Sequence, residues 1–191
     1  FSLGSAQVKI LGPVRETDET NNTSIVLRIV YGDTSFLFTG DAEREEEEDI
    51  LDTGEVLKST VLKVGHHGSD SSTSYPFLRE VMPEHGVISV GTGNTYGHPT
   101  QEVLSRLSDA GVTVYRTDLQ GDIICTSDGA EVTFRTAKDT APPEGRKPDQ
   151  EEKEYIPNTN TMKFHAPACS SAEEMGPGNK KEFKGTREEP L

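Results

Sequence analysis

The chain has 191 residues, of which only 31% are hydrophobic, so we expect part of it to lie outside a packed core. Because 33 Asp and Glu outnumber 19 Lys and Arg, the formal net charge is −14, which disfavours a broad basic surface for nucleic acid. The two cysteines are too few for a disulfide framework, and no run approaches the roughly 18 apolar residues of a membrane span, which predicts a soluble chain.

The first elements along the chain are β-strands. AQVKILGP, at 6–13, predicts a short strand, and a polar loop follows it. SIVLRIVYGDTSFLFTGD, at 24–41, holds two β-rich runs around Gly32-Asp33, a residue pair suited to a tight hairpin. Both faces of the first run are apolar apart from Arg28, so we expect this strand to be buried on both sides. The pattern favours a layered α/β sandwich.

An acidic helix is predicted next. AEREEEEDILDTG begins after Asp41 and reaches Gly54, and its glutamates suit the positive end of the helix dipole. We interpret the acidic run as a solvated helix face, and a patch that gathers metal ions is the alternative.

Strands and helices then alternate, which indicates an α/β layered domain. The sequence predicts strands at 60–65, 86–91 and 112–117, and helices at 74–83 and 100–110 with Gly111 past the end of the second. A final hairpin at 121–136 is closed by Asp128-Gly129.

The composition changes from Ala137 onward. Residues 137–154 are charged and rich in proline, which predicts a flexible linker without a core. Residues 155–191 contain a few aromatic residues together with His165 and Cys169, and we expect a small module there. The remaining residues, 1–136, form the main predicted domain.

Two strand ends carry candidate metal ligands. Asp41 follows FTG, and the adjacent His66 and His67 follow VLKVG; carboxylate and imidazole are ligands of zinc and manganese. Asp41 could instead cap the acidic helix. Because neighbouring side chains on an extended backbone point in opposite directions, one histidine would ligate a metal while the other faces substrate or a partner group.

A third strand end leads into the glycine-rich loop SVGTGNTYGHPT, which carries Asn94, Tyr96 and His98. A turn in which His98 caps the next helix is the alternative. Three such strand ends predict one shared site at an edge of the sheet. His85 precedes a strand at the opposite edge, and we interpret it as structural.

Four blocks resemble the metallo-β-lactamase-fold hydrolase domain of ComEC-type DNA-uptake proteins. They are NNTSIVLRIVYGDTSFLFTGD, VLKVGHHGSDSSTS, GVISVGTGNTYGHPT and VYRTDLQGDIICTSDG, and the resemblance covers roughly residues 1–136. It implies an αββα sandwich with two divalent metal ions, zinc or manganese. Asp41 would bridge the ions, and one of His66 and His67, preferably His67, would ligate one of them.

One family motif is absent. H-x-H-x-D-H, which lies upstream in the family, does not occur in this sequence. We therefore expect a C-terminal portion of the domain whose partner is the missing N-terminal half, and poor metal binding by this chain alone. In the tail, YIPNTNTMKFHAPACSS resembles the start of an Ada-type zinc module, in which His165 and Cys169 would be ligands.

The resemblance implies a metal-dependent phosphodiesterase or nuclease that acts on DNA. In the complete site Asn94, Tyr96 and His98 would contact the phosphate or the leaving group, with His98 as the general acid. A hydrolase of small phosphoesters or other esters is one alternative. The other is a non-catalytic DNA-binding or assembly module of an uptake apparatus.

Overall fold

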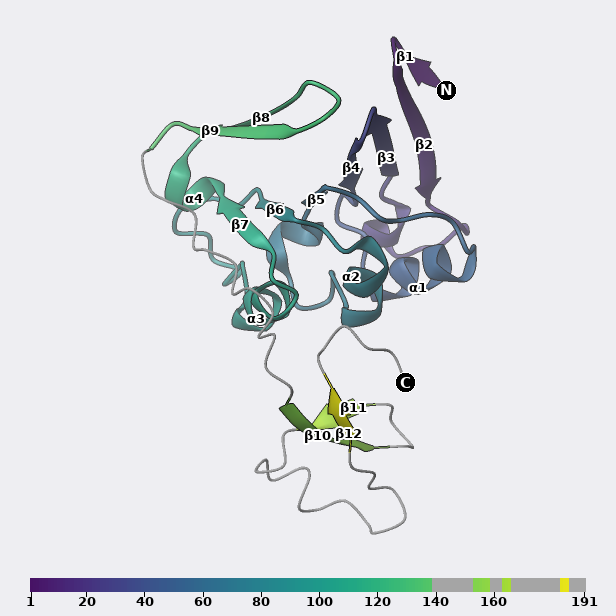
Figure 1. Ribbon diagram of the computed structural model, residues 1–191, viewed down its shortest axis with the longest axis vertical. Coiled ribbons are helices and arrows are strands. Elements are labelled where there is room, and N and C mark those ends of the chain that lie inside the picture. Colours follow the sequence, from purple (N-terminus) through teal and green to yellow (C-terminus); the bar gives the residue numbers. More distant parts are fainter. Residues whose placement is uncertain (139–152, 159–162, 166–182, 186–191) are drawn as a thin grey trace. The chain divides into compact units, whose positions relative to one another are not determined.

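The computed structural model describes residues 1–138 and the strand residues 153–158, 163–165 and 183–185 (Figure 1). The chain divides into two compact units, Phe1–Arg146 and Lys147–Leu191. In the part of the chain that is described, no helix is both long and apolar enough to cross a bilayer.

The first unit is built on a seven-stranded sheet in which the strands follow one another in chain order. Its strands are β1 (Ser2–Leu3), β2 (Ala6–Gly12), β3 (Val26–Tyr31), β4 (Thr34–Phe38), β5 (Val61–Lys63), β6 (His85–Ile88) and β7 (Thr113–Arg116). Pairing is antiparallel from β1 to β4 and parallel from β4 to β7. The hairpin predicted at Gly32-Asp33 joins β3 to β4.

Helices α1, α2 and α3 cover one face of this sheet (Figure 1). The helical elements are η1 (Thr20–Thr23), α1 (Arg44–Asp52), η2 (Gly65–Gly68), α2 (Tyr75–Val81), α3 (Gln101–Asp109) and α4 (Thr117–Gln120). The Thr100 hydroxyl caps α3 by accepting a hydrogen bond from the amide of Val103, and Glu43 is the N-cap residue of α1. The capping alternatives for Asp41 and His98 are therefore wrong.

The main core lies between the helices and the sheet. Leu37 of β4 pairs in register with Leu62 of β5, and both side chains are fully buried. Phe77 of α2 and Leu107 of α3 belong to the same buried cluster. Burial of each such side chain contributes about 1.5–3 kcal/mol, so this cluster holds the helices against the sheet.

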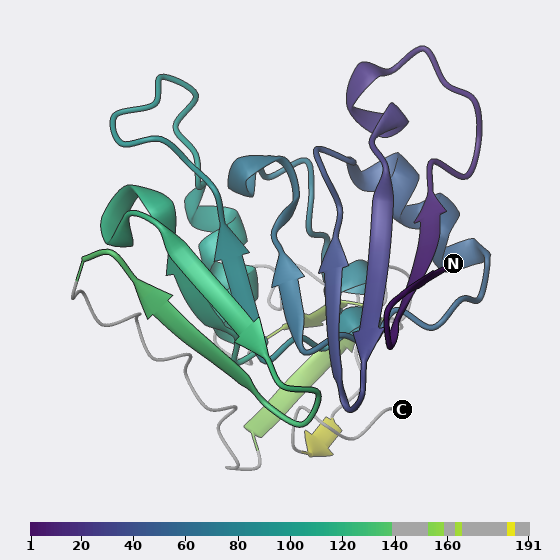
Figure 2. The same cartoon turned by 90° about the horizontal axis from the view of Figure 1, so that it is seen from above.

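A hairpin covers part of the opposite face. Its strands, β8 (Ile123–Ser127) and β9 (Val132–Thr136), cross over β6 and β7 (Figure 2). The ring of Phe134 lies 4.1 Å from that of Tyr115 and 4.9 Å from that of His85, measured between centroids. The hairpin therefore forms a second, narrow layer.

The turn of this hairpin contacts the β3–β4 turn. The amide of Asp33 donates a hydrogen bond of 2.7 Å to the carbonyl oxygen of Gly129. A Cβ atom at Gly32 would lie 2.1 Å from the same oxygen, and the φ of Gly32 is +59°. Both the turn and this close approach therefore require glycine at position 32.

The rest of that face is open. The open face consists of apolar side chains that the hairpin does not cover: Ile10, Leu27, Ile29, Phe36 and Phe38. Ile10 is 59% exposed and Phe38 is 40% exposed. The expectation that β3 is buried on both sides is wrong, because the described residues provide no covering layer beyond the hairpin.

The acidic run in α1 is only partly solvated, which corrects its interpretation as a solvated face. Glu45 and Glu48 are exposed, whereas Glu46 and Glu47 are 2% and 1% exposed. The Glu46 carboxylate accepts a hydrogen bond of 2.8 Å from the amide of Val14. Burial raises the pKa of Glu47, against the opposing effect of its hydrogen bonds and of Arg106.

Glu47 and Arg106 hold the backbone of residues 70–74, which we call the clamped loop. The two carboxylate oxygens of Glu47 accept hydrogen bonds from the amides of Thr73 and Ser74. The Arg106 guanidinium, from α3, donates to the carbonyl oxygens of Asp70, Ser72 and Thr73 at 2.9, 2.8 and 2.7 Å. Two buried charged groups thus satisfy the polar backbone of this loop.

The second unit contains a three-stranded antiparallel sheet with the order β11-β10-β12. The strands are β10 (Lys153–Asn158), β11 (Lys163–His165) and β12 (Phe183–Gly185). His165 is the last residue of β11, and Cys169 lies outside the described residues, as do residues 139–152 of the predicted linker.

We expect Glu47→Gln to lower the free energy of unfolding by about 1–3 kcal/mol. A glutamine amide group would face a backbone N–H group and leave it without an acceptor. Glu48→Gln, on the exposed side of α1, is the matched control and should change stability by less than about 0.5 kcal/mol. Urea denaturation of the three proteins measures the difference. Equal stability of the two variants would contradict the role given to Glu47.

A second prediction concerns pH. Burial lowers the pKa of His85 below its ordinary 6.5, against a smaller opposing effect of Glu84. The unfolded chain then binds more protons than the folded chain just below pH 6.5, so the stability present above that pH is lost as pH falls through the lowered pKa. Denaturation between pH 7.5 and 5.5 should show a smaller loss in His85→Gln than in wild type. An identical loss of stability in the two proteins would contradict the assignment of this pH dependence to His85.

Candidate functional site

The site lies where the parallel strands β4 and β5 end. Phe38 and Lys63 are paired at their carboxyl ends, so the segments that follow leave the sheet at one edge. Asp41 comes from the first segment and His66 from the second. The amide of His66 donates a hydrogen bond of 3.0 Å to the carbonyl oxygen of Gly40, which ties the two segments together.

His67 and Asp41 form the closest pair of candidate ligands. The Nε2 atom of His67 lies 3.6 Å from Oδ1 of Asp41. Nδ1 of His67 lies 2.7 Å from the carbonyl oxygen of Ser89, which can only accept a hydrogen bond. Nδ1 therefore carries a proton, which leaves Nε2 of the neutral ring with a free lone pair on the side of Asp41.

His66 has a different set of partners. Its Nδ1 atom lies 3.1 Å from Oε1 of Glu43 and 3.5 Å from the hydroxyl of Ser71, and that hydroxyl donates to the same carboxylate. Its ring lies 5.7 Å from the ring of His98. Glu43 and Ser71 were not predicted to belong to the site, although Ser71 lies within the block that carries His66 and Glu43 comes two residues after Asp41.

The backbone of the histidine pair differs from the extended form that was expected. His66 has φ 44° and ψ 48°, and His67 has φ 54° and ψ 18°, so both adopt the left-handed conformation. The two residues form a left-handed turn between β5 and Gly68, in which the amide of Ser69 donates a hydrogen bond to the carbonyl oxygen of His66. The argument from alternating side chains is therefore wrong, and each residue carries a conformational cost of about 1–2 kcal/mol.

His98 completes the group of histidines. Burial lowers the pKa of His98, repulsion from the rings of His66 and His67 when they are protonated lowers it further, and the carboxylate of Asp70 raises it. Its Nδ1 atom is buried and has no hydrogen-bond partner among the described residues. A lowered pKa favours the neutral ring, which suits a ligand or a proton acceptor, whereas the role of His98 as general acid requires the protonated ring and stays a prediction.

Asn94 shapes the loop rather than presenting a free amide. Its Nδ2 atom donates to the carbonyl oxygens of Gly91 and His98, at 3.2 and 2.7 Å, and its Oδ1 atom accepts from the amide of His98 at 3.1 Å. Tyr96 is 82% exposed, and its ring stacks on that of His98. Of the two, only Tyr96 presents its side chain outward.

Lys63 adds a positive charge beside Asp41. Its ammonium group donates a hydrogen bond of 2.8 Å to the carbonyl oxygen of Val64. Burial lowers the pKa of Lys63, and the carboxylate of Asp41 raises it. Sequence reasoning missed this residue, because a lysine in the third position of a short strand carries no motif of its own.

The donors present do not complete a metal centre. Within the described part of the chain, no three His, Cys, Asp or Glu side chains converge where they could hold one ion. Zinc in proteins takes about four ligands, so Asp41 and His67 provide only part of a set. Nδ1 of His98, which has no hydrogen-bond partner among the described residues, is a further nitrogen atom near this pair.

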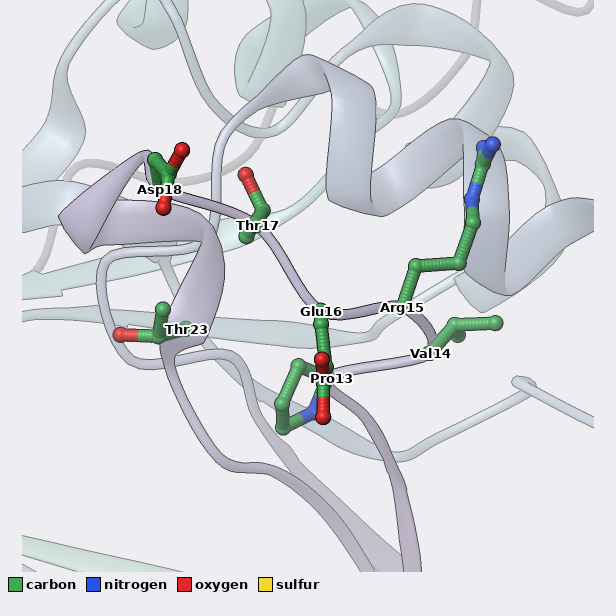
Figure 3. A pocket seen from close by; sticks show the side chains of 7 residues that line it. All are labelled: Pro13, Val14, Arg15, Glu16, Thr17, Asp18 and Thr23. Carbon is green, nitrogen blue, oxygen red and sulfur yellow. The ribbon is translucent and has the colours of Figure 1, made fainter.

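Two hollows lie on the first unit. The larger, of about 570 Å³, is formed by the loop after β2 and contains none of the candidate ligands (Figure 3). Its lining residues are Pro13, Val14, Arg15, Glu16, Thr17, Asp18 and Thr23. The smaller, of about 330 Å³, includes Glu43 and Ser71 and so lies next to His66. Its wall is mainly acidic and would repel a phosphate.

Comparison with known proteins agrees with the resemblance drawn from the motifs. Residues 10–92 match the Metallo-beta-lactamase superfamily. ComE operon protein 3 of Bacillus subtilis (strain 168) is 40% identical over 124 residues, which cover 64% of this chain and 16% of that protein. Competence protein ComA of Neisseria gonorrhoeae is 44% identical over 108 residues, 56% of this chain and 16% of that protein.

Recombination protein 2 of Haemophilus influenzae (strain ATCC 51907 / DSM 11121 / KW20 / Rd) is 36% identical over 116 residues, which cover 60% of this chain and 14% of that protein. The chain thus spans less than a fifth of the length of these curated relatives. The mixed sheet with helices on one face confirms the predicted α/β class. Residues 10–92 thus match the metallo-beta-lactamase superfamily, and the chain is related to the competence proteins.

Proposed function

We propose that this chain is part of a metal-dependent hydrolase that cleaves phosphodiesters, with DNA as its substrate. The observation that carries the proposal is the pair of Asp41 and His67, 3.6 Å apart at the ends of adjacent parallel strands. The match to the superfamily supports a hydrolase, and the names of two relatives, a competence protein and a recombination protein, support DNA.

Each residue of the site has a proposed role in the complete protein. The Asp41 carboxylate and Nε2 of His67 are oxygen and nitrogen donors for the metal ions, and Ser89 fixes the tautomer of His67. Two divalent ions, zinc or manganese, would supply Lewis acidity toward a phosphate. His98, as a neutral ring, accepts a proton or contacts the phosphate. The remaining ligands come from residues outside this chain.

The open face indicates where those residues lie. A β-sheet with apolar side chains on both faces is stable when a second layer covers the exposed one. The β8–β9 hairpin already covers the neighbouring part of this face, so the layer continues over Ile10, Ile29 and Phe38. We assign this position to the N-terminal half of the domain, which would bring the upstream metal motif.

Two alternative functions differ from the proposed nuclease in what they bind or cleave. The net charge of −14 favours a small phosphoester or other ester over a polyanion. The same charge counts against a non-catalytic DNA-binding or assembly module. Hydrolysis of single-stranded DNA, compared with that of bis-p-nitrophenyl phosphate by the complete protein, distinguishes the nuclease from the small-ester hydrolase. Salt-dependent DNA binding without any hydrolysis would favour the module.

In the complete protein, Asp41→Ala should reduce bound metal and lower kcat/KM by at least about a hundredfold, because a ligand to both ions is lost. His98→Ala should cost less activity and little metal. Asp52→Ala, an exposed aspartate at the end of α1, is the matched control. Elemental analysis and a hydrolysis assay measure both effects. Equal metal content in wild type and Asp41→Ala would contradict the assignment.

The covering layer has its own test. Ile10→Lys should lower the free energy of unfolding of the complete protein by about 2–5 kcal/mol, since it would bury an unpaired charge. Ile124→Lys is the matched control, because both isoleucines are 59% exposed and Ile124 lies on the outer face of β8. In the chain alone both substitutions should change stability by less than about 0.5 kcal/mol. Equal effects in the complete protein would contradict a layer over Ile10.

A further inference from the structure

Tyr96 is an aromatic side chain that the fold leaves uncovered. It is 82% exposed, although a tyrosine usually buries much of its ring. Its neighbours along the loop, Asn94, Thr95 and Gly97, bring no large apolar side chain beside it. An isolated aromatic ring of this kind does not resemble a surface that a lipid or an apolar protein partner covers.

The loop that carries Tyr96 is held in place. Asn94 bonds both ends of the loop through its side chain, and the hydroxyl of Thr92 donates to the backbone of α4 at 3.1 Å. A Cβ atom at Gly93 or Gly97 would meet no other atom within 4 Å, so the space beside the loop is open. A ring on such a loop is presented to a ligand at little cost in conformational entropy.

Tyr96 ends a row of four rings that reaches the candidate ligands. Between centroids the rings of His67 and His66 are 6.3 Å apart, those of His66 and His98 are 5.7 Å apart, and those of His98 and Tyr96 are 6.0 Å apart. The last two rings are nearly parallel, with 17° between their planes. The two rings are 6.0 Å apart and Tyr96 is 82% exposed, so the tyrosine ring keeps a face free to stack.

We propose that Tyr96 is a stacking platform for one base of a single-stranded nucleic acid whose phosphate lies at the Asp41–His67 pair. This proposal rests on the proposed function, to which it adds a residue that binds a base of the substrate. A planar base stacks on an aromatic ring whatever its sequence, and each stacked base raises affinity roughly five- to hundredfold. Stacking needs no basic residue, so it provides affinity on a protein with a net charge of −14.

The test separates stacking from contacts with the backbone of the nucleic acid. A single-stranded oligodeoxynucleotide is compared with one of the same length in which every base is replaced by an abasic site. Both carry phosphorothioate linkages that slow cleavage. Dissociation constants for the complete protein are measured by fluorescence anisotropy at one salt concentration, because phosphate contacts depend on salt.

Wild type should bind the oligonucleotide that carries bases at least about tenfold more tightly than it binds the abasic one. In Tyr96→Ala this preference should fall to less than about twofold, whereas Tyr96→Phe should keep it because the aromatic face remains. Tyr75→Ala is the matched control: Tyr75 is 54% exposed on α2, away from the ring row, and its loss should leave the preference unchanged.

A wild-type protein without the preference, or Tyr96→Ala that retains it, would overturn the platform. Cleavage of unmodified DNA is measured separately. If the preference depends on Tyr96 and no cleavage of DNA occurs, the platform stands and the proposed nuclease activity fails. If DNA is cleaved and Tyr96→Ala binds as wild type does, the nuclease stands and the platform fails.

Discussion

The parallel pairing of β4, β5 and β6 is the constraint from which the candidate site follows. In this arrangement the carboxyl ends of the strands lie side by side, with Phe38 opposite Lys63 and Lys63 opposite Val87. A short polar segment therefore follows each strand at the same edge of the sheet. An antiparallel order would send alternate segments to opposite edges, and Asp41 and His67 could not meet.

A strained turn at this edge needs support from the surrounding structure. Both histidines of the pair have left-handed backbone conformations, which persist only where neighbouring interactions fix them. The clamped loop follows directly, and Glu47 and Arg106 satisfy its backbone from α1 and α3. The buried charges and the strained turn are therefore parts of one arrangement, in which the helices hold the segment that carries the candidate ligands.

Local signals predicted much of this fold, and contacts between distant segments account for what was missed. Gly32-Asp33 predicted the hairpin between β3 and β4, and the polar residues that follow apolar runs predicted the edge of the sheet that carries the site. The burial of Glu47 could not be read from a run of glutamates, because its hydrogen-bond donors lie 26 and 27 residues further along the chain. The left-handed His67 was missed because it was treated as a continuation of its strand.

The contact between Gly32 and Gly129 fixes more than two turns. It joins the tip of the β3–β4 hairpin to the tip of the β8–β9 hairpin, so it sets the separation of the two layers at that end. Packed β-layers lie about 10 Å apart, which is room for two interlocking sets of side chains. The direct hydrogen bond between the two tips brings the layers closer than this at that end, so a segment that continues the second layer over Ile10 and Phe38 must fit beside tips that already touch.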